Sequence, residues 1–73
     1  MPPKPMPARE VVSRLERIGF ARVSQRGSHL KHRRERNGKT YTVVVPMHRN
    51  DIAISVLGRI LQQGGLDWSD FGE

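Results

Sequence analysis

The chain has 73 residues, no cysteine and a formal net charge of +6. This length allows one small domain with a thin core, and the lack of cysteine excludes disulfides and thiolate metal sites. No apolar run approaches the about 20 residues that span a bilayer, and the first residues lack the hydrophobic stretch of a secretory signal. We therefore expect a cytoplasmic protein with no membrane partner.

Positive charge is concentrated in the middle of the chain. Residues 20–49 carry eight Lys or Arg and one Glu, whereas residues 50–73 carry one Arg and four carboxylates. A concentrated basic segment favours a polyanionic partner such as nucleic acid. The alternative is a solvated basic surface that only maintains solubility, and charge alone does not decide between the two.

The proline-rich residues 1–7 predict an extended, flexible lead, followed by a single domain over residues 8–73. Residues 8–19 have the spacing of one amphipathic helical face. Pro7 suits the first turn of this helix and Gly19 suits its end. The apolar positions of the face are Ala8, Val11, Val12, Leu15 and Ile18.

Three strands are expected next, over residues 20–26, 28–36 and 39–45. The first has Phe20 and Val23 as its apolar members. Between the second and third, Asn37-Gly38 is a strong signal for a type I′ hairpin turn, which needs φ > 0 at both central residues. The third strand is rich in β-branched residues, and Pro46 ends it.

An apolar stripe at helical spacing predicts a second helix that ends at Gly64-Gly65. Asp51 and Ser55 are alternative N-caps, so the start of this helix stays open. The stripe consists of Ile52, Ala53, Val56, Leu57, Ile60 and Leu61. A short C-terminal segment is expected to pack back on the core through Leu66, Trp68 and Phe71.

The order α-β-β-β-α predicts an α+β fold, with a three-stranded antiparallel sheet and both helices on one of its faces. The other face is then open to carry basic side chains. Because side chains alternate along a strand, His29, Lys31 and Arg33 share this open face. Leu30 and His32 point toward the helices, where we expect His32 to be packed or hydrogen-bonded.

The same alternation argues against a metal site. His29 and His32 point to opposite faces of one strand, so they cannot bind one ion together. The basic segment contains a single carboxylate, Glu35, whereas a two-metal nuclease needs several. We therefore expect no metal and no cofactor.

Without a metal ion, the remaining mechanism for cleaving a phosphodiester is acid–base catalysis by side chains. RNA supplies its own nucleophile, the 2′-hydroxyl, and His29 is the candidate general base. The candidate phosphate contacts are the side chains of Arg26, Lys31 and Arg33 and the backbone N–H groups of Gly27 and Ser28. The general acid stays open between His48, Lys31 and His29 itself, and the alternative role of His48 is to hold the turn into the second helix.

Gly27-Ser28-His29 stands before a short basic hairpin, which leads to Val44-Val45-Pro46-Met47-His48 and a final helix. Together with the first helix and Gly19-Phe20 before it and Phe71 near the end, this combination resembles the HicA (YcfA-like) family of toxin ribonucleases, the mRNA interferases of toxin–antitoxin systems, over nearly the whole chain apart from the proline-rich lead. The resemblance implies a double-stranded-RNA-binding-like fold, ribosome-independent cleavage of mRNA, and His29 as the catalytic histidine. It also implies a HicB-type antitoxin that covers the active face, and contact with DNA only through the complex with that antitoxin.

Two functions from different classes therefore fit the sequence. The first is a toxin endoribonuclease that uses His29, and the second is a non-catalytic small RNA-binding module. Charge and fold fit both, because a double-stranded-RNA-binding architecture reads backbone shape and 2′-hydroxyls without chemistry. The discriminating feature is His29 with the preceding Gly27-Ser28, since a pure binding surface needs neither.

Overall fold

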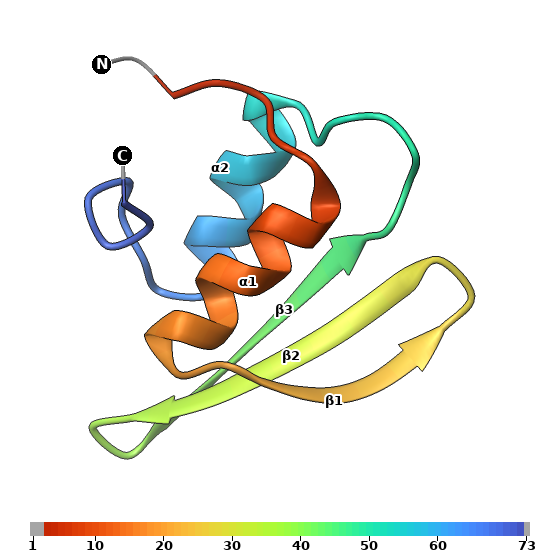
Figure 1. Ribbon diagram of the computed structural model, residues 1–73. Coiled ribbons are helices and arrows are strands. Elements are labelled where there is room, and N and C mark those ends of the chain that lie inside the picture. Colours follow the sequence, from red (N-terminus) through yellow and green to blue (C-terminus); the bar gives the residue numbers. More distant parts are fainter. Residues whose placement is uncertain (1–2, 73) are drawn as a thin grey trace.

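A three-stranded antiparallel sheet with strand order β1-β2-β3 forms one layer of the molecule, and two helices form the other (Figure 1). The computed structural model describes residues 3–72. Its elements are α1 (Ala8–Ile18), β1 (Ala21–Arg26), β2 (His29–Arg36), β3 (Lys39–Pro46) and α2 (Ile54–Gln63). The predicted α-β-β-β-α order is confirmed, and with it the α+β fold.

Helix α1 forms where the sequence predicts it and ends for the predicted reason. Gly19 adopts φ +117°, a left-handed conformation that suits glycine, and its N–H donates to Glu16 O at 3.1 Å. Pro7 stands one position before the helix, as its N-cap, rather than in the first turn. The side chains buried on one face of the helix are Ala8, Val11, Val12 and Leu15.

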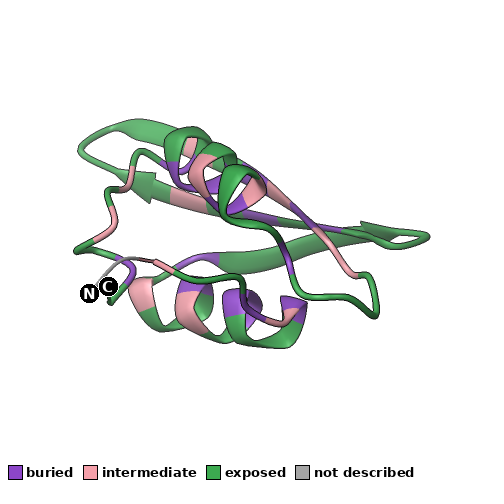
Figure 2. Ribbon diagram, turned by 90° about the horizontal axis from the view of Figure 1, so that it is seen from above, coloured by how far each residue is buried: buried purple, intermediate pink, exposed green. Residues whose placement is uncertain are grey.

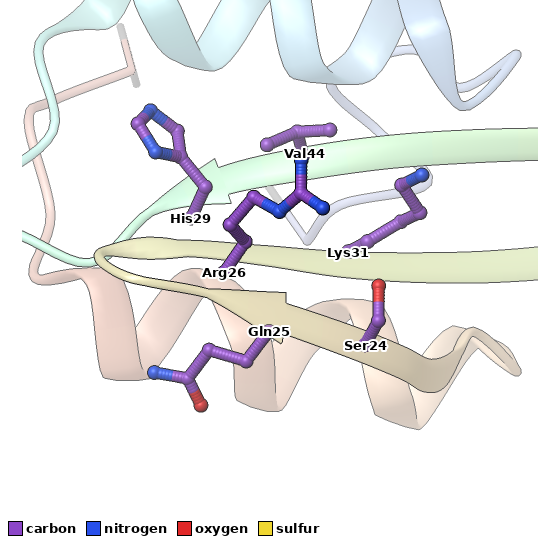
Figure 3. Close-up of a pocket in the computed structure, with 6 residues that line it drawn as sticks. All are labelled: Ser24, Gln25, Arg26, His29, Lys31 and Val44. Carbon is purple, nitrogen blue, oxygen red and sulfur yellow. The ribbon is translucent and has the colours of Figure 1, made fainter.

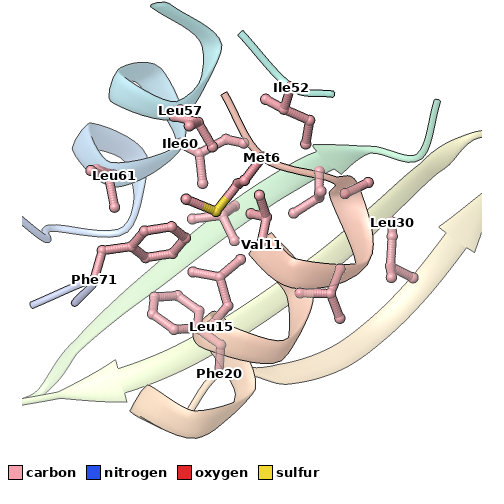
Figure 4. Packing of buried hydrophobic residues seen from close by; sticks show 14 residues of the cluster. Met6, Val11, Leu15, Phe20, Leu30, Ile52, Leu57, Ile60, Leu61 and Phe71 are labelled. Atoms are coloured by element: carbon pink, nitrogen blue, oxygen red, sulfur yellow. The ribbon is translucent and has the colours of Figure 1, made fainter. Parts of the chain in front are cut away.

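The core lies between the helices and the covered face of the sheet (Figure 4). Leu30 of β2 and Val43 and Val45 of β3 are buried there, and they contact the apolar faces of the helices. After α2, the C-terminal segment returns to this core: Phe71 is buried, and Leu66 and Trp68 are partly buried. This placement confirms the prediction for that segment.

Two tight turns connect the strands, each with a residue of positive φ. Asn37 and Gly38 have φ of +53° and +75°, which confirms the predicted type I′ turn between β2 and β3. Between β1 and β2, Gly27 has φ +60° and Ser28 does not share the positive φ. A positive φ at the first central residue alone is typical of a type II′ turn, which favours glycine there.

Strand β1 departs from the prediction for residues 20–26. Phe20 is buried but precedes the strand, and Val23 is exposed at 43%. The register shifts between Arg22 and Ser24, so Val23 lies at a β-bulge. All of β1 is exposed, as Figure 2 shows. A period-two pattern assumes an uninterrupted ladder, and the bulge breaks it.

The lead also joins the fold earlier than predicted. Met6 is 6% exposed and pairs with Ile52 through two backbone hydrogen bonds, Ile52 N–H to Met6 O at 2.8 Å and Met6 N–H to Ile52 O at 3.3 Å. The packed unit therefore includes Met6 and not only residues from Ala8 onward. Of the lead over residues 1–7, the first two lie outside the described residues.

The same pairing explains where α2 begins. Because Ile52 uses both of its backbone polar groups with Met6, it stays extended and the helix starts only at Ile54. Ala53 is the N-cap and no side chain caps the helix, so neither Asp51 nor Ser55 has the predicted role. Neither helix in the described part of the chain is long and apolar enough to cross a membrane.

Candidate active site

The open face of the sheet carries the histidine that the sequence singles out. Along β2, His29, Lys31 and Arg33 are exposed, whereas Leu30 and His32 are buried against the helices. The alternation predicted from a straight strand is therefore confirmed for all five positions. A side chain at position 29 is free to meet a substrate, and one at position 32 is not.

Pairing between β1 and β2 brings a second strand into the site. Arg26 lies directly opposite His29, and Ser24 lies directly opposite Lys31. On the other side of β2, Val44 of β3 is opposite Lys31. Cross-strand partners share one face of a sheet, so these side chains form a single group on the open face.

This group surrounds a shallow hollow of about 450 Å³. In Figure 3, Arg26 extends across the sheet between His29 and Lys31, and Gln25 points away from them. Gln25 donates from its side-chain amide to Gly27 O at 3.2 Å, which ties it to the turn. The residues that line the hollow are Ser24, Gln25, Arg26, His29, Lys31 and Val44.

Gly27 and Ser28 form the turn at the edge of this hollow, and a hydrogen bond joins the turn to the end of β3. Met47 N–H donates to Ser28 O at 2.6 Å, one step beyond the last pair of the ladder, His29 with Pro46. This contact fixes the backbone directly before His29. His48 follows Met47 and is exposed, but it does not line the hollow.

Among the described residues, the three basic side chains named for the open face form no salt bridge with a carboxylate. These side chains, Arg26, Lys31 and Arg33, are all exposed. Arg33 lies beyond Lys31 along β2 and outside the lining of the hollow. Uncompensated cations beside an exposed imidazole suit a phosphate group, which needs charge-assisted hydrogen bonds.

His32 has a structural environment instead. Its ring is fully buried, and Nε2 lies 3.0 Å from Glu16 Oε2 of α1. Because a carboxylate only accepts hydrogen bonds, Nε2 carries the proton in this contact. The prediction of a packed or hydrogen-bonded His32 is confirmed. Arg34 acts on the same side, donating to Ile18 O at 3.2 Å.

Three residues that line the hollow were not predicted from the sequence: Ser24, Gln25 and Val44. Ser24 faces the open side only because of the bulge at Val23, which no residue pattern announces. Val44 was foreseeable, since a residue between the buried Val43 and Val45 must point to the opposite face. Within residues 3–72 no three His, Asp or Glu side chains are grouped so that they could hold a metal ion.

Comparison with known proteins supplies the family. No curated protein matches this chain. A model of the family described as the HicA toxin of bacterial toxin–antitoxin systems matches residues 8–66, which include both helices, the whole sheet and every residue that lines the hollow. The chain therefore belongs to the HicA family of toxins from bacterial toxin–antitoxin systems.

Proposed function

We propose that this toxin is an endoribonuclease that cleaves mRNA independently of the ribosome, and that His29 is its catalytic residue. The observation that carries the proposal is the exposed His29 imidazole beside Arg26 and Lys31 on the open face of the sheet. An acid–base group and uncompensated cations are the two requirements for cleavage by the RNA's own 2′-hydroxyl.

In the proposed reaction, His29 removes the proton from a 2′-hydroxyl, and the oxygen attacks the adjacent phosphorus. The P–O5′ bond breaks, which leaves a 2′,3′-cyclic phosphate on one product, and the departing 5′-oxygen takes up a proton. Arg26 and Lys31 stabilise the charge on the phosphate oxygens. Neither a metal nor a cofactor takes part.

Other residues have supporting roles in the proposal. Arg33 contacts a neighbouring phosphate, and the N–H groups of Gly27 and Ser28 add hydrogen bonds at the turn. Three groups are candidates for the acid that protonates the 5′-oxygen: Lys31 within the hollow, His48 in the loop after β3, and His29 after it has accepted its proton. The position of Met47 against Ser28 keeps the backbone of His48 near the turn.

The proposed setting is a cytoplasmic toxin–antitoxin pair. A HicB-type antitoxin covers the open face and blocks access of mRNA, and the toxin meets DNA only within that complex. When the antitoxin is lost, cleavage of mRNA stops translation and growth.

Replacing His29 by alanine tests the proposal. We expect the His29→Ala variant to lose cleavage by about 10²–10⁴-fold, the usual contribution of a general base, and to lose toxicity in a host without the antitoxin. The measurement is cleavage of an mRNA by purified protein with a chelator present. Because His29 is exposed, its replacement leaves the core intact, and a thermal unfolding curve verifies this.

The same cleavage and binding measurements distinguish the endoribonuclease from a non-catalytic RNA-binding module. If the wild-type protein cuts no RNA but binds it with strong salt dependence, the chain is a binding module. If His29→Ala cleaves as well as the wild type, the catalytic assignment of His29 is wrong.

A further inference from the structure

We propose that the hollow beside His29 is a binding site for one unpaired nucleobase next to the scissile phosphate, with Val44 as its apolar floor and Ser24 as its polar contact. This inference rests on the proposed function, because it assigns the substrate group that lies beside the reacting phosphate. It separates two tasks on one face: cations hold the phosphate, and two uncharged side chains hold the base.

Val44 is the first argument for a base. It is the one aliphatic side chain among the six that line the hollow, and it is partly exposed within an otherwise basic surface. A phosphate gains nothing from such a contact, whereas the flat face of a base is apolar and loses water against it. Val43 and Val45 fill the core, so Val44 is not needed there.

The position of Val44 relative to His29 is the second argument. Val44 is opposite Lys31, and Lys31 is two residues from His29 along β2, a rise of about 6.6 Å. A nucleotide whose phosphate contacts His29 and Lys31 can therefore place its base over Val44. Figure 3 shows Val44 at the end of the Arg26 side chain, with His29 on one side and Lys31 on the other.

The bulge at Val23 is the third argument. Without it, Ser24 would follow the parity of β1 and point toward the helices, because Arg22 is opposite the buried His32. The bulge instead sets Ser24 opposite Lys31, on the open face. A serine hydroxyl both donates and accepts, so it can contact the edge of a base.

The shape of the hollow favours an unpaired base. Its volume of about 450 Å³ is at the lower end of the range for small-ligand sites, and it is open to solvent. An isolated base can turn into such a hollow, whereas a base within a duplex keeps its faces stacked on its neighbours. Sequence-specific RNA recognition usually targets unpaired segments for this reason.

Mapping of cleavage sites tests the inference. We expect Val44→Ala and Ser24→Ala each to change the base preference at one position beside the cleaved bond by at least about threefold, because each removes part of the contact to that base. The control is Thr42→Ala, an exposed residue on the same face of β3 but outside the hollow, which should keep the wild-type preference. The substrate is a pool of RNAs with randomised sequence.

A binding measurement separates failure of this inference from failure of the proposed function. Wild-type protein is titrated with 2′-O-methyl dinucleotides, which lack the attacking hydroxyl, while NMR follows the Val44 methyl groups and the Ser24 amide. We expect saturable, base-dependent shifts at both residues of the wild-type protein, and a weaker shift of the Ser24 amide in Val44→Ala. If RNA is cleaved but the preference is unchanged in both variants, or if these signals do not respond to the base, the inference is overturned. If no RNA is cleaved, the proposed function fails, and the titration alone decides on the base site.

Discussion

His29 and His32 are three residues apart on one strand, and the pleat of that strand gives them different environments. The imidazole of His29 is exposed beside two cations, whereas the ring of His32 is fully buried against Glu16. Nδ1 of His32 has no hydrogen-bond partner among the described residues. The face of the sheet on which each histidine lies therefore determines its surroundings. On the open face the imidazole is available to a substrate, and on the covered face it packs against α1.

A substitution series at His32 measures its packing role. We expect His32→Ala to lower the free energy of unfolding by about 2–4 kcal/mol, because it leaves a cavity between α1 and the sheet. His32→Leu should cost less, since it nearly keeps the volume and Glu16, whose side chain is 45% exposed, can bond to water instead. Urea unfolding measures both.

Cleavage by the leucine variant is the control for that series. Folded His32→Leu protein should cleave RNA at nearly the wild-type rate, because the ring is on the covered face of the sheet. A loss as large as that expected for His29→Ala, with folding intact, would contradict a purely structural role for His32.

Among the connecting segments, two glycines with almost the same φ have different surroundings. Gly27 has φ +60° and a Cβ added there would meet nothing within 4 Å. Gly65, which follows α2, has φ +66°, and an added Cβ would lie 2.5 Å from Cε1 of the Tyr41 ring. Gly27 is thus required by its turn alone, whereas Gly65 also lets the segment after α2 pack directly on β3.

Alanine at the two glycines separates these effects. Gly27→Ala should cost about 1–2 kcal/mol of unfolding free energy, the usual penalty of a left-handed conformation. Gly65→Ala carries this penalty and a further cost of about 1–3 kcal/mol from the overlap with Tyr41. Thermal or urea unfolding compares the two, and the further cost should disappear in a Tyr41→Ala background. Equal losses in both variants would show that the Tyr41 ring moves aside freely.

Sequence patterns correctly predicted those elements whose structure is determined by residues close together in the chain. The apolar spacing and Gly19 defined α1, Asn37-Gly38 defined one turn, and alternation along β2 separated His29 from His32. Each of these signals lies within a few residues of the structure it specifies. They were sufficient for the fold class and for the face on which His29 lies.

What the patterns missed depends on partners that are distant in the chain or on the pairing of strands. The start of α2 is set by Met6, which binds Ile52 from the other end of the sequence. The exposure of Ser24 is set by a bulge, which depends on how β1 pairs with β2. Neither cause leaves a signal in the residues around the affected position.

At the scale of the whole molecule, the open face is basic, but the helical layer carries exposed cations as well. Arg26, Lys31 and Arg33 belong to the open face. Arg59 is exposed on α2, on the other side of the sheet, and Asp67 lies in the segment that follows this helix. The Ser69 hydroxyl and the Asp70 N–H donate hydrogen bonds to the Asp67 carboxylate and lower its pKa from the ordinary value, which favours its negatively charged form. A net charge of +6 therefore does not by itself say which side meets RNA.

Two matched arginines distinguish the open face from the general charge. Binding of a single-stranded 2′-O-methyl oligonucleotide should weaken as salt rises, with a slope of log affinity against log salt of about −0.7 for each phosphate contact. Arg33→Ala should make this slope shallower by about 0.7, because it removes one contact from the open face. Arg59→Ala removes the same charge from the helical layer and should leave the slope unchanged. Fluorescence anisotropy over a salt series measures both. If the two variants lose affinity and slope equally, binding responds to net charge and the open face has no special part in it.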